Sequence, residues 1–237
     1  MIRTILFSVL AMLLISNNSL AQGFKGLNFG LFGYGSIGGG NITTSGLSET
    51  LTSFDLITKD VSVSSTNLGL GGSFTSRQFV LTVYGGFDFL HSPNSIETKV
   101  NRSSSSANIN IGYVVYRHNY TQYYPSIGIG NRLNYMSIEN KRGSDKMFGE
   151  VVIASSQTEK FELQNSFLDI SLNSSSFNSP FSYVPLGYQV NVSIGYQYSL
   201  SKSKWNSITS NEVVNLVPAT STNGIYIRLQ LGGGLFM

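Results

Sequence analysis

The chain has 237 residues, of which 41% are hydrophobic, 12% aromatic and only 11% charged, and its formal net charge is +3. This aromatic content argues against a disordered chain, and the sparse, mixed charges exclude the dense basic surface that nucleic acids require. The chain has no cysteine, which excludes disulfides, thiolate nucleophiles and cysteine–zinc sites.

The first 21 residues have the pattern of a secretory signal peptide. Arg3 supplies the positive charge, residues 4–15 form a mostly apolar stretch, and Ser19 and Ala21 flank Leu20 in a small-x-small cleavage pattern. The apolar stretch is shorter than the ~18–20 residues that a membrane-spanning helix needs. We therefore expect a signal peptide at 1–21 and one exported domain at 22–237, whose ~215 residues suit a single domain.

Eight segments of the exported part predict β-strands, because apolar residues recur in them at every second position. The predicted strands span residues 27–37, 66–75, 78–90, 107–118, 123–138, 161–172, 183–200 and 224–236. Several are long compared with strands of globular proteins, which average about 5–6 residues, whereas about 10 tilted residues cross a bilayer. The lengths favour a transmembrane barrel over a soluble β-sandwich.

The alternation is clearest in the seventh strand, where Leu186, Tyr188, Val190 and Val192 are separated by Gly187, Gln189 and Asn191. The sixth strand breaks this rhythm. Its apolar residues Phe161 and Leu163 lie on one parity, whereas Leu168, Ile170 and Leu172 lie on the other. We expect a β-bulge near Phe167 to account for the change of phase.

The connections between the predicted strands alternate in length. Short links at 76–77 and 119–122 and a medium one at 173–182 alternate with long ones at 38–65, 91–106, 139–160 and 201–223. This alternation is typical of an antiparallel barrel with short periplasmic turns and long external loops. Two clusters of aromatic residues fit the membrane interfaces: Tyr113, Tyr116, Tyr120, Tyr123 and Tyr124 at one end, and Tyr196, Tyr198 and Trp205 at the other.

These features predict an all-β fold, a transmembrane antiparallel up-and-down β-barrel of eight strands. The chain resembles the small eight-stranded outer-membrane barrels of Gram-negative bacteria, the group that includes the OmpA transmembrane domain and OmpX. The resemblance rests on the signal peptide, the eight strands, the loop lengths and the closing segment 224–237. It implies an outer-membrane location, contact with outer-membrane lipids and lipopolysaccharide, and insertion by the barrel-assembly machinery. In such proteins the last residue is usually aromatic, whereas here Met237 is last and Phe236 stands one position early.

The polar face of the strands should line the interior of the barrel. An eight-stranded barrel is just wide enough for side chains to fill it. Asp88 with Arg132 or Arg228 is the candidate buried ion pair, because a buried charge without a partner is costly. The other candidate interior residues are polar side chains of the same parity: Tyr84, Asn110, Gln189, Asn191 and Gln230. We expect this network to plug the interior, and the alternative is a narrow gated pore.

Catalytic and metal-binding patterns are weak. His91, Ser92 and Glu97 lie near the outer end of the third strand, but adjacent strand residues point to opposite faces, and His118 lies at the opposite, periplasmic end. The acidic residues are too scattered to form a metal site. We therefore expect no enzymatic activity, no cofactor and no metal.

The sequence thus predicts an outer-membrane protein with a structural or surface-interaction role. The external loops are polar and nothing in them identifies a ligand. Three alternatives stay open: a narrow channel for small or hydrophobic solutes, a lipid A-modifying enzyme, and a soluble secreted β-sandwich.

Overall fold

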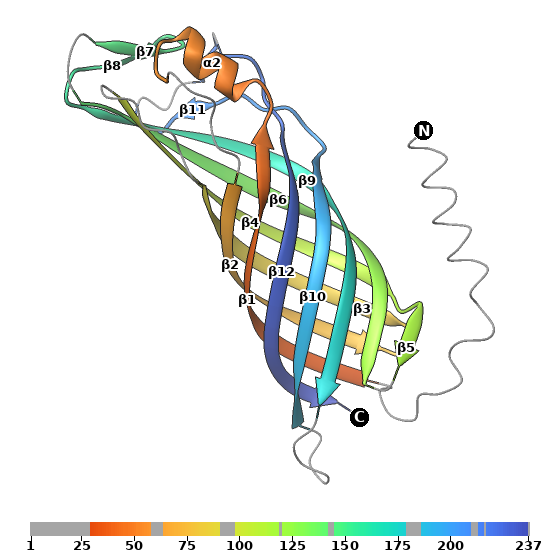
Figure 1. The fold of residues 1–237 in the computed structure, drawn as a ribbon. Helices are drawn as coiled ribbons and strands as arrows, with labels where there is room; N and C mark the ends of the chain where they lie inside the picture. The colour runs from red at the N-terminus through yellow and green to blue at the C-terminus, as the bar shows by residue number, and fades with distance from the viewer. Residues whose placement is uncertain are drawn as a thin grey trace.

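A computed structural model shows one sheet that closes on itself (Figure 1). It describes residues 29–57, 64–90, 98–118, 120–141, 145–178, 186–209, 213–215 and 217–236. The predicted signal peptide, residues His91, Ser92 and Glu97, and Met237 lie outside these ranges.

Eight long antiparallel strands form the wall, as the sequence predicts. They are β1 (Phe29–Thr44), β2 (Ser64–Ser76), β3 (Phe79–Leu90), β4 (Thr98–Tyr113), β6 (Thr121–Asn140), β9 (Thr158–Asn178), β10 (Leu186–Ser199) and β12 (Thr222–Phe236). Each pairs with the next in this order, and β12 pairs with β1 from Gly30↔Phe236 to Thr44↔Thr222. Closure leaves no exposed strand edge in the wall, so its backbone groups are satisfied within the sheet.

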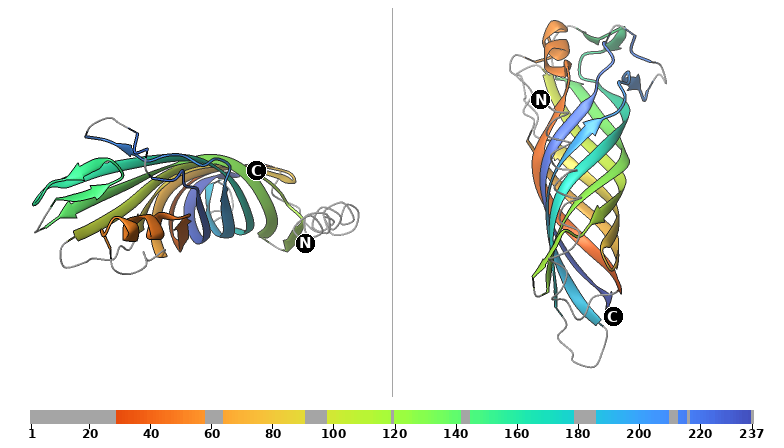
Figure 2. Two further views of the ribbon diagram at one scale, coloured as in Figure 1. Left: turned by 90° about the horizontal axis from the view of Figure 1, so that it is seen from above. Right: turned by 90° about the vertical axis from the view of Figure 1, so that its right-hand side faces the viewer.

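Five short elements complete the described chain. They are α2 (Leu47–Ser53), β5 (Tyr116–His118), β7 (Lys146–Phe148), β8 (Val151–Ile153) and β11 (Asn206–Ser207). β5 pairs with β6 at the end of the barrel where the short turns and the C-terminus lie, whereas α2, β7, β8 and β11 gather at the other end (Figure 2). In the described residues, no helix is long and apolar enough to cross a membrane.

The wall has an apolar outer face and a polar inner face, which is the reverse of a soluble protein. Large apolar side chains on alternate positions point outward and are exposed; among them are Leu70, Phe87, Ile129, Leu172 and Ile227. The intervening positions point inward and are largely polar. This arrangement suits a lipid surround, because the hydrocarbon solvates the outer face and the polar groups bond to one another inside. The alternative of a soluble β-sandwich is wrong, since a sandwich would bury its apolar face.

The expected bulge near Phe167 is also wrong. The register between β9 and its neighbours is unbroken, from Tyr188↔Asn178 to Ser199↔Phe167 on one side and over the whole pairing with β6 on the other. The inward positions of β9 alternate regularly through Phe161, Leu163 and Phe167. What changes along the strand is the environment of the inward face, which becomes apolar beyond the membrane.

Strand β4 starts nine residues earlier than predicted, at Thr98 rather than Ala107. Its first half contains the run Ser103–Ser106, which has no apolar alternation and therefore gave no strand signal. Backbone pairing with β3 and β6 nevertheless continues through it. β4, β6 and β9 thus extend beyond the barrel toward α2 and the β7–β8 hairpin (Figure 1).

The aromatic clusters are divided between outward and inward positions. Tyr116, Tyr120 and Tyr123 are exposed near the short turns, and the Tyr116 and Tyr123 rings lie 5.8 Å apart. Tyr124, however, is buried inside the barrel, and Trp205 is fully buried rather than placed at the outer membrane interface. The interface assignment of these two residues was therefore wrong.

Candidate functional site

The lower part of the lumen, next to the short turns, is filled by apolar and aromatic side chains. Phe32 and Phe177 meet across it with ring centroids 5.2 Å apart, and Val80 packs with Val114 and Tyr124. These groups offer no path for a hydrated ion at this end of the described barrel.

A polar layer lies above. Gln189 accepts a hydrogen bond from Ser73 at 2.9 Å and donates one to Ser175 at 3.0 Å. Asn191 donates to Gln230, and Asn108 donates to Asn110 at 2.9 Å. The predicted interior residues Asn110, Gln189, Asn191 and Gln230 all lie in this network and are buried. Cross-strand amide and hydroxyl pairs thus brace the wall from within.

Tyr84 and Arg228 form the centre of the lumen. The guanidinium of Arg228 lies 3.6 Å from the Tyr84 ring centroid and 4.5 Å from that of Tyr226. The other side of the Tyr84 ring lies against glycine backbone, because a Cβ atom at Gly69 or Gly86 would overlap its ring or hydroxyl. The Tyr84 hydroxyl donates to Asn67. Glycine on two strands therefore makes room for a cation–π stack.

We expect Gly86→Ala to destabilise the barrel by about 1–3 kcal/mol, because the added methyl group must displace Tyr84 from beneath Arg228. Gly85→Ala is the matched control, since its methyl group would point to lipid with its nearest neighbour, the Ser106 carbonyl, at 3.9 Å. Urea titration of both variants in lipid vesicles measures this difference in stability. A folded barrel runs as a compact band in an unheated gel, and the urea concentration at which this compact gel band is lost gives the midpoint of unfolding. Equal urea midpoints for the two variants would contradict the role of Gly86 in making room for the Tyr84 ring.

The buried charges are held mainly by neutral groups. The Asp88 carboxylate accepts from Asn67 at 2.8 Å and from Ser104 at 3.0 Å. The Arg132 guanidinium donates to Gln197 and lies 5.3 Å from the Phe167 ring centroid. The negative charges of Asp88 and Asp169 also stabilise the positive charge of Arg132 at longer range.

The sequence brought the right three charged residues together but not the right contacts. Asp88, Arg132 and Arg228 are all buried, and all three line one small internal cavity. Yet within the described residues the direct ion pair is between Lys146 and Asp55, not between Asp88 and an arginine. The amide and hydroxyl donors of Asn67 and Ser104 occupy the Asp88 carboxylate instead.

Asp169 was not among the residues predicted from the sequence, yet three hydrogen bonds hold its charge in the lumen. Its carboxylate accepts from Tyr226 at 2.8 Å, Asn108 at 3.0 Å and Gln197 at 3.2 Å. Asp169 alternates with the outward residues Leu168 and Ile170, which could have placed its side chain inside the barrel. The predicted bulge near Phe167 made the orientation of the residues around it uncertain. Arg102, which donates to Thr44 at 2.7 Å, was missed because β4 was predicted to start later.

The two internal cavities found among the described residues of the polar lumen are small. Two cavities within the polar part of the lumen each have a volume of about 10 Å³, enough for one water molecule. One lies beside Asp88, Arg132 and Arg228, and the other beside Tyr34, Asn191 and Gln230. The polar side chains thus fill the lumen.

The external end is a folded cap rather than a set of polar loops. Its core consists of buried apolar residues from distant segments: Leu47, Leu51, Leu56, Ile57, Val100, Met136, Ile138, Phe148, Ile153, Phe161, Leu163, Trp205, Val214 and Val217. The inward faces of β4, β6 and β9 supply one side of this core, and α2, the β7–β8 hairpin and the Trp205 segment supply the other. The Phe148 and Phe161 rings meet at 4.8 Å. The expectation of merely polar loops was therefore wrong.

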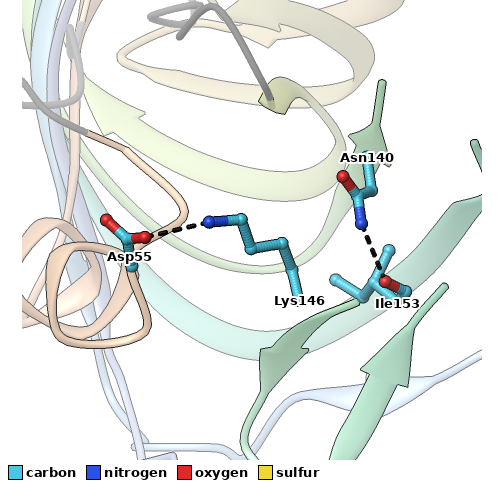
Figure 3. A network of polar contacts seen from close by, with 4 residues as sticks. All are labelled: Asp55, Asn140, Lys146 and Ile153. Carbon is cyan, nitrogen blue, oxygen red and sulfur yellow. Dashed lines mark hydrogen bonds and ion pairs between the residues drawn. The ribbon is translucent and has the colours of Figure 1, made fainter. Parts of the chain in front are cut away.

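Polar contacts attach the hairpin to the rest of the cap, and Figure 3 shows two of them. Lys146 Nζ lies 2.9 Å from Asp55, which follows α2, and Asn140 at the end of β6 donates to the Ile153 carbonyl at 3.0 Å. The Asp55 side chain is 83% exposed, so this ion pair contributes little to stability. The buried Asn140 contact is the firmer of the two.

Of the catalytic candidates, His91, Ser92 and Glu97 lie outside the described residues, and His118 lies within them. His118 stacks on Tyr116 with centroids 6.5 Å apart, at the end of the barrel opposite the cap. In the described ranges, no three His, Asp or Glu side chains are grouped as a metal site. Asp145 accepts from the Ser155 amide at 3.0 Å, which is a local loop contact.

No protein family and no curated protein matches this chain. Among solved structures, it is similar to Ail, the attachment invasion locus protein of Yersinia pestis, with 9% identity and a TM-score of 0.44 over 90% of this chain and 100% of that one. It is also similar to Neisserial surface protein A, with 12% identity and a TM-score of 0.44 over 87% and 97% of the chains. For the outer membrane protein AlkL the values are 10% and 0.38 over 93% and 96%. The closed sheet and its apolar outer face make this chain an outer-membrane β-barrel protein.

Proposed function

We propose that this protein is a non-conducting surface barrel that presents its folded cap as a binding platform. The cap core carries the proposal, because burying so many apolar side chains holds segments between Leu47 and Val217 in one fixed arrangement. A merely shielding loop would not need such a core. A fixed surface loses little conformational freedom on binding, which favours recognition.

The lumen supports a structural role for the barrel itself. An apolar lower layer, a hydrogen-bonded polar layer and the cap core follow one another along the axis. A narrow channel would need a continuous wet path, whereas the polar cavities here hold about one water each. We propose no enzymatic activity and no cofactor.

The exposed face of the β7–β8 hairpin is the part of the cap best suited to contact a partner. Met147 and Val152 are direct cross-strand partners, and about half of each side chain is exposed. Adjacent exposed apolar groups on the external surface favour protein contact. Outer-membrane lipids, including lipopolysaccharide, would surround the wall, and the barrel-assembly machinery would insert it.

A conductance measurement tests the sealed lumen. We expect the purified barrel in planar bilayers to show no discrete current steps. The double variant Tyr84→Ala, Arg228→Ala should also show none, because the apolar lower layer around Phe32 and Phe177 and the cap core still close the lumen. Gly85→Ala, on the lipid face, should stay silent. Steps from the wild-type barrel would instead support the narrow channel.

Selection from a displayed peptide library tests the platform. Peptides that bind the purified barrel should lose about ten-fold or more in affinity on the double variant Met147→Ser, Val152→Ser, because the exposed apolar pair is the proposed contact. Lys202→Gln, elsewhere in the external segments, is the control. If no peptide is enriched, or if binding is equal on both variants, the hairpin is not the contact surface.

A further inference from the structure

The lipid-facing wall is hollowed on one side, at strands β3, β4, β6 and β9. A groove of about 470 Å³ is lined on its outer side by Val83, Ile109, Ile129 and Leu200, with Ala107, Asn131 and Ser166 between them. The register explains the hollow, because Gly85, Ala107, Asn131 and Ser166 are consecutive cross-strand partners and all are small or polar. Larger apolar residues occupy the row below.

The groove contains a polar pair within the apolar belt. Ser166 donates to the Asn131 side-chain oxygen at 2.8 Å. Within the described chain, no acceptor is present for the Asn131 Nδ2 amide. A hydrogen-bond donor facing hydrocarbon costs free energy unless a partner satisfies it. A lipid carbonyl facing the groove would supply this acceptor.

The depth of Asn131 agrees with a lipid linkage group. Asn131 lies eight residues along β6 from Tyr123, which is exposed near the short turns. With a rise of about 3.3 Å per residue and a tilt of about 40°, this places Asn131 roughly 20 Å above Tyr123 in an apolar belt roughly 25 Å tall. The Asn131–Ser166 pair therefore lies near the external limit of the belt, where acyl chains join lipid headgroups.

A second groove of about 420 Å³ lies above the first on the same strands. Its lining includes Phe89, Ser103, Tyr135 and Lys160. In the part of the chain that the structure describes, no ion pair holds the Lys160 ammonium, and Glu162, two residues along the same outward face of β9, does not line the groove. The wall thus presents, in order from the membrane centre outward, an apolar groove, an amide donor and an exposed cation.

We propose that this face binds one anionic lipid of the external leaflet. Its acyl chain lies in the lower groove, its linkage carbonyl accepts from Asn131 Nδ2, and its phosphate lies at Lys160. A second copy of the barrel fits less well, because two hollows brought face to face enclose a void. This site is separate from the cap and does not depend on what the cap binds.

Native mass spectrometry of the full barrel in detergent micelles, supplied with phosphatidylglycerol or phosphatidylcholine, tests the proposal. We expect one bound phosphatidylglycerol, retained about five-fold better than phosphatidylcholine, as a single interfacial lysine allows. Lys160→Gln should remove this preference without abolishing binding. Ala107→Trp should fill the lower groove and abolish binding of both lipids.

Controls and a second variant keep the test decisive. Ile225→Trp, on the lipid face of β12, and Lys202→Gln should bind as the wild type does. Where Ala107→Trp fails to give the compact gel band, Asn131→Leu replaces it and should weaken the binding of both lipids. Four results would each overturn the proposal. They are an equal loss of lipid binding in the Ile225→Trp control, no preference for the anionic lipid, competition by millimolar inorganic phosphate alone, and a dimer that Ala107→Trp separates.

Discussion

Asp169→Leu should destabilise the barrel by about 3–5 kcal/mol, the cost of removing one partner from a buried charge network. The substitution leaves Tyr226, Asn108 and Gln197 without their acceptor, and it removes a negative charge that stabilises Arg132. Asp169→Asn should cost less, because it retains the shape and one acceptor oxygen. The urea concentration at which the compact gel band is lost in vesicles measures the change.

Asp55→Asn is the matched control for this loss of a carboxylate. The Asp55 side chain is 83% exposed, and an ion pair with so exposed a carboxylate contributes about 1 kcal/mol or less. If Asp169→Leu proves as mild as Asp55→Asn, the buried network does not hold the wall together.

Trp205→Ala should unfold the cap while the barrel stays closed. Trp205 is fully buried in the cap core, and truncating a buried aromatic side chain costs about 3–5 kcal/mol. The wall should survive because its pairing closes independently of the cap. Limited proteolysis of vesicle-inserted protein should cleave the external segments in the variant and spare them in the wild type.

Two further variants separate the cap from the membrane interface. Trp205→Phe should keep most of the protection, because it retains apolar volume and loses an indole N–H that has no partner in the described structure. Tyr198→Ala removes an aromatic ring on the lipid face near the same end and should leave the cap intact. Loss of the compact gel band in Trp205→Ala would show that cap and barrel fold as one unit.

The strands of the wall were predictable from the sequence, because the alternation of apolar and polar residues depends only on neighbouring positions of one strand. A strand with lipid on one side and a polar lumen on the other alternates at every position, so parity alone places Tyr84, Gln189 and Asn191 inside. The same rule located Asp88 and Arg132. It could not show which groups they bond to, because Asn67 and Ser104 reach Asp88 from different strands.

The cap was not predictable by the same rule. Its core joins Leu47 to Val217, and no periodicity relates residues so far apart. The phase change in β9 was in fact its signal, since Phe161 and Leu163 are apolar on the inward parity. An inward apolar residue beyond the membrane implies a covering partner, and no bulge is needed to explain the change of phase.

The most direct test of the whole account is a cysteine scan along β10 in lipid bilayers, which the cysteine-free chain makes clean. Single cysteines at Val192, Ile194 and Tyr196 should carry spin labels accessible to oxygen dissolved in the lipid. Labels at Asn191 and Ser193 should be accessible neither to oxygen nor to a water-soluble relaxing agent, because the lumen is filled. Water accessibility at Asn191 and Ser193 would reveal an open pore, and a pattern without alternation would contradict the barrel itself.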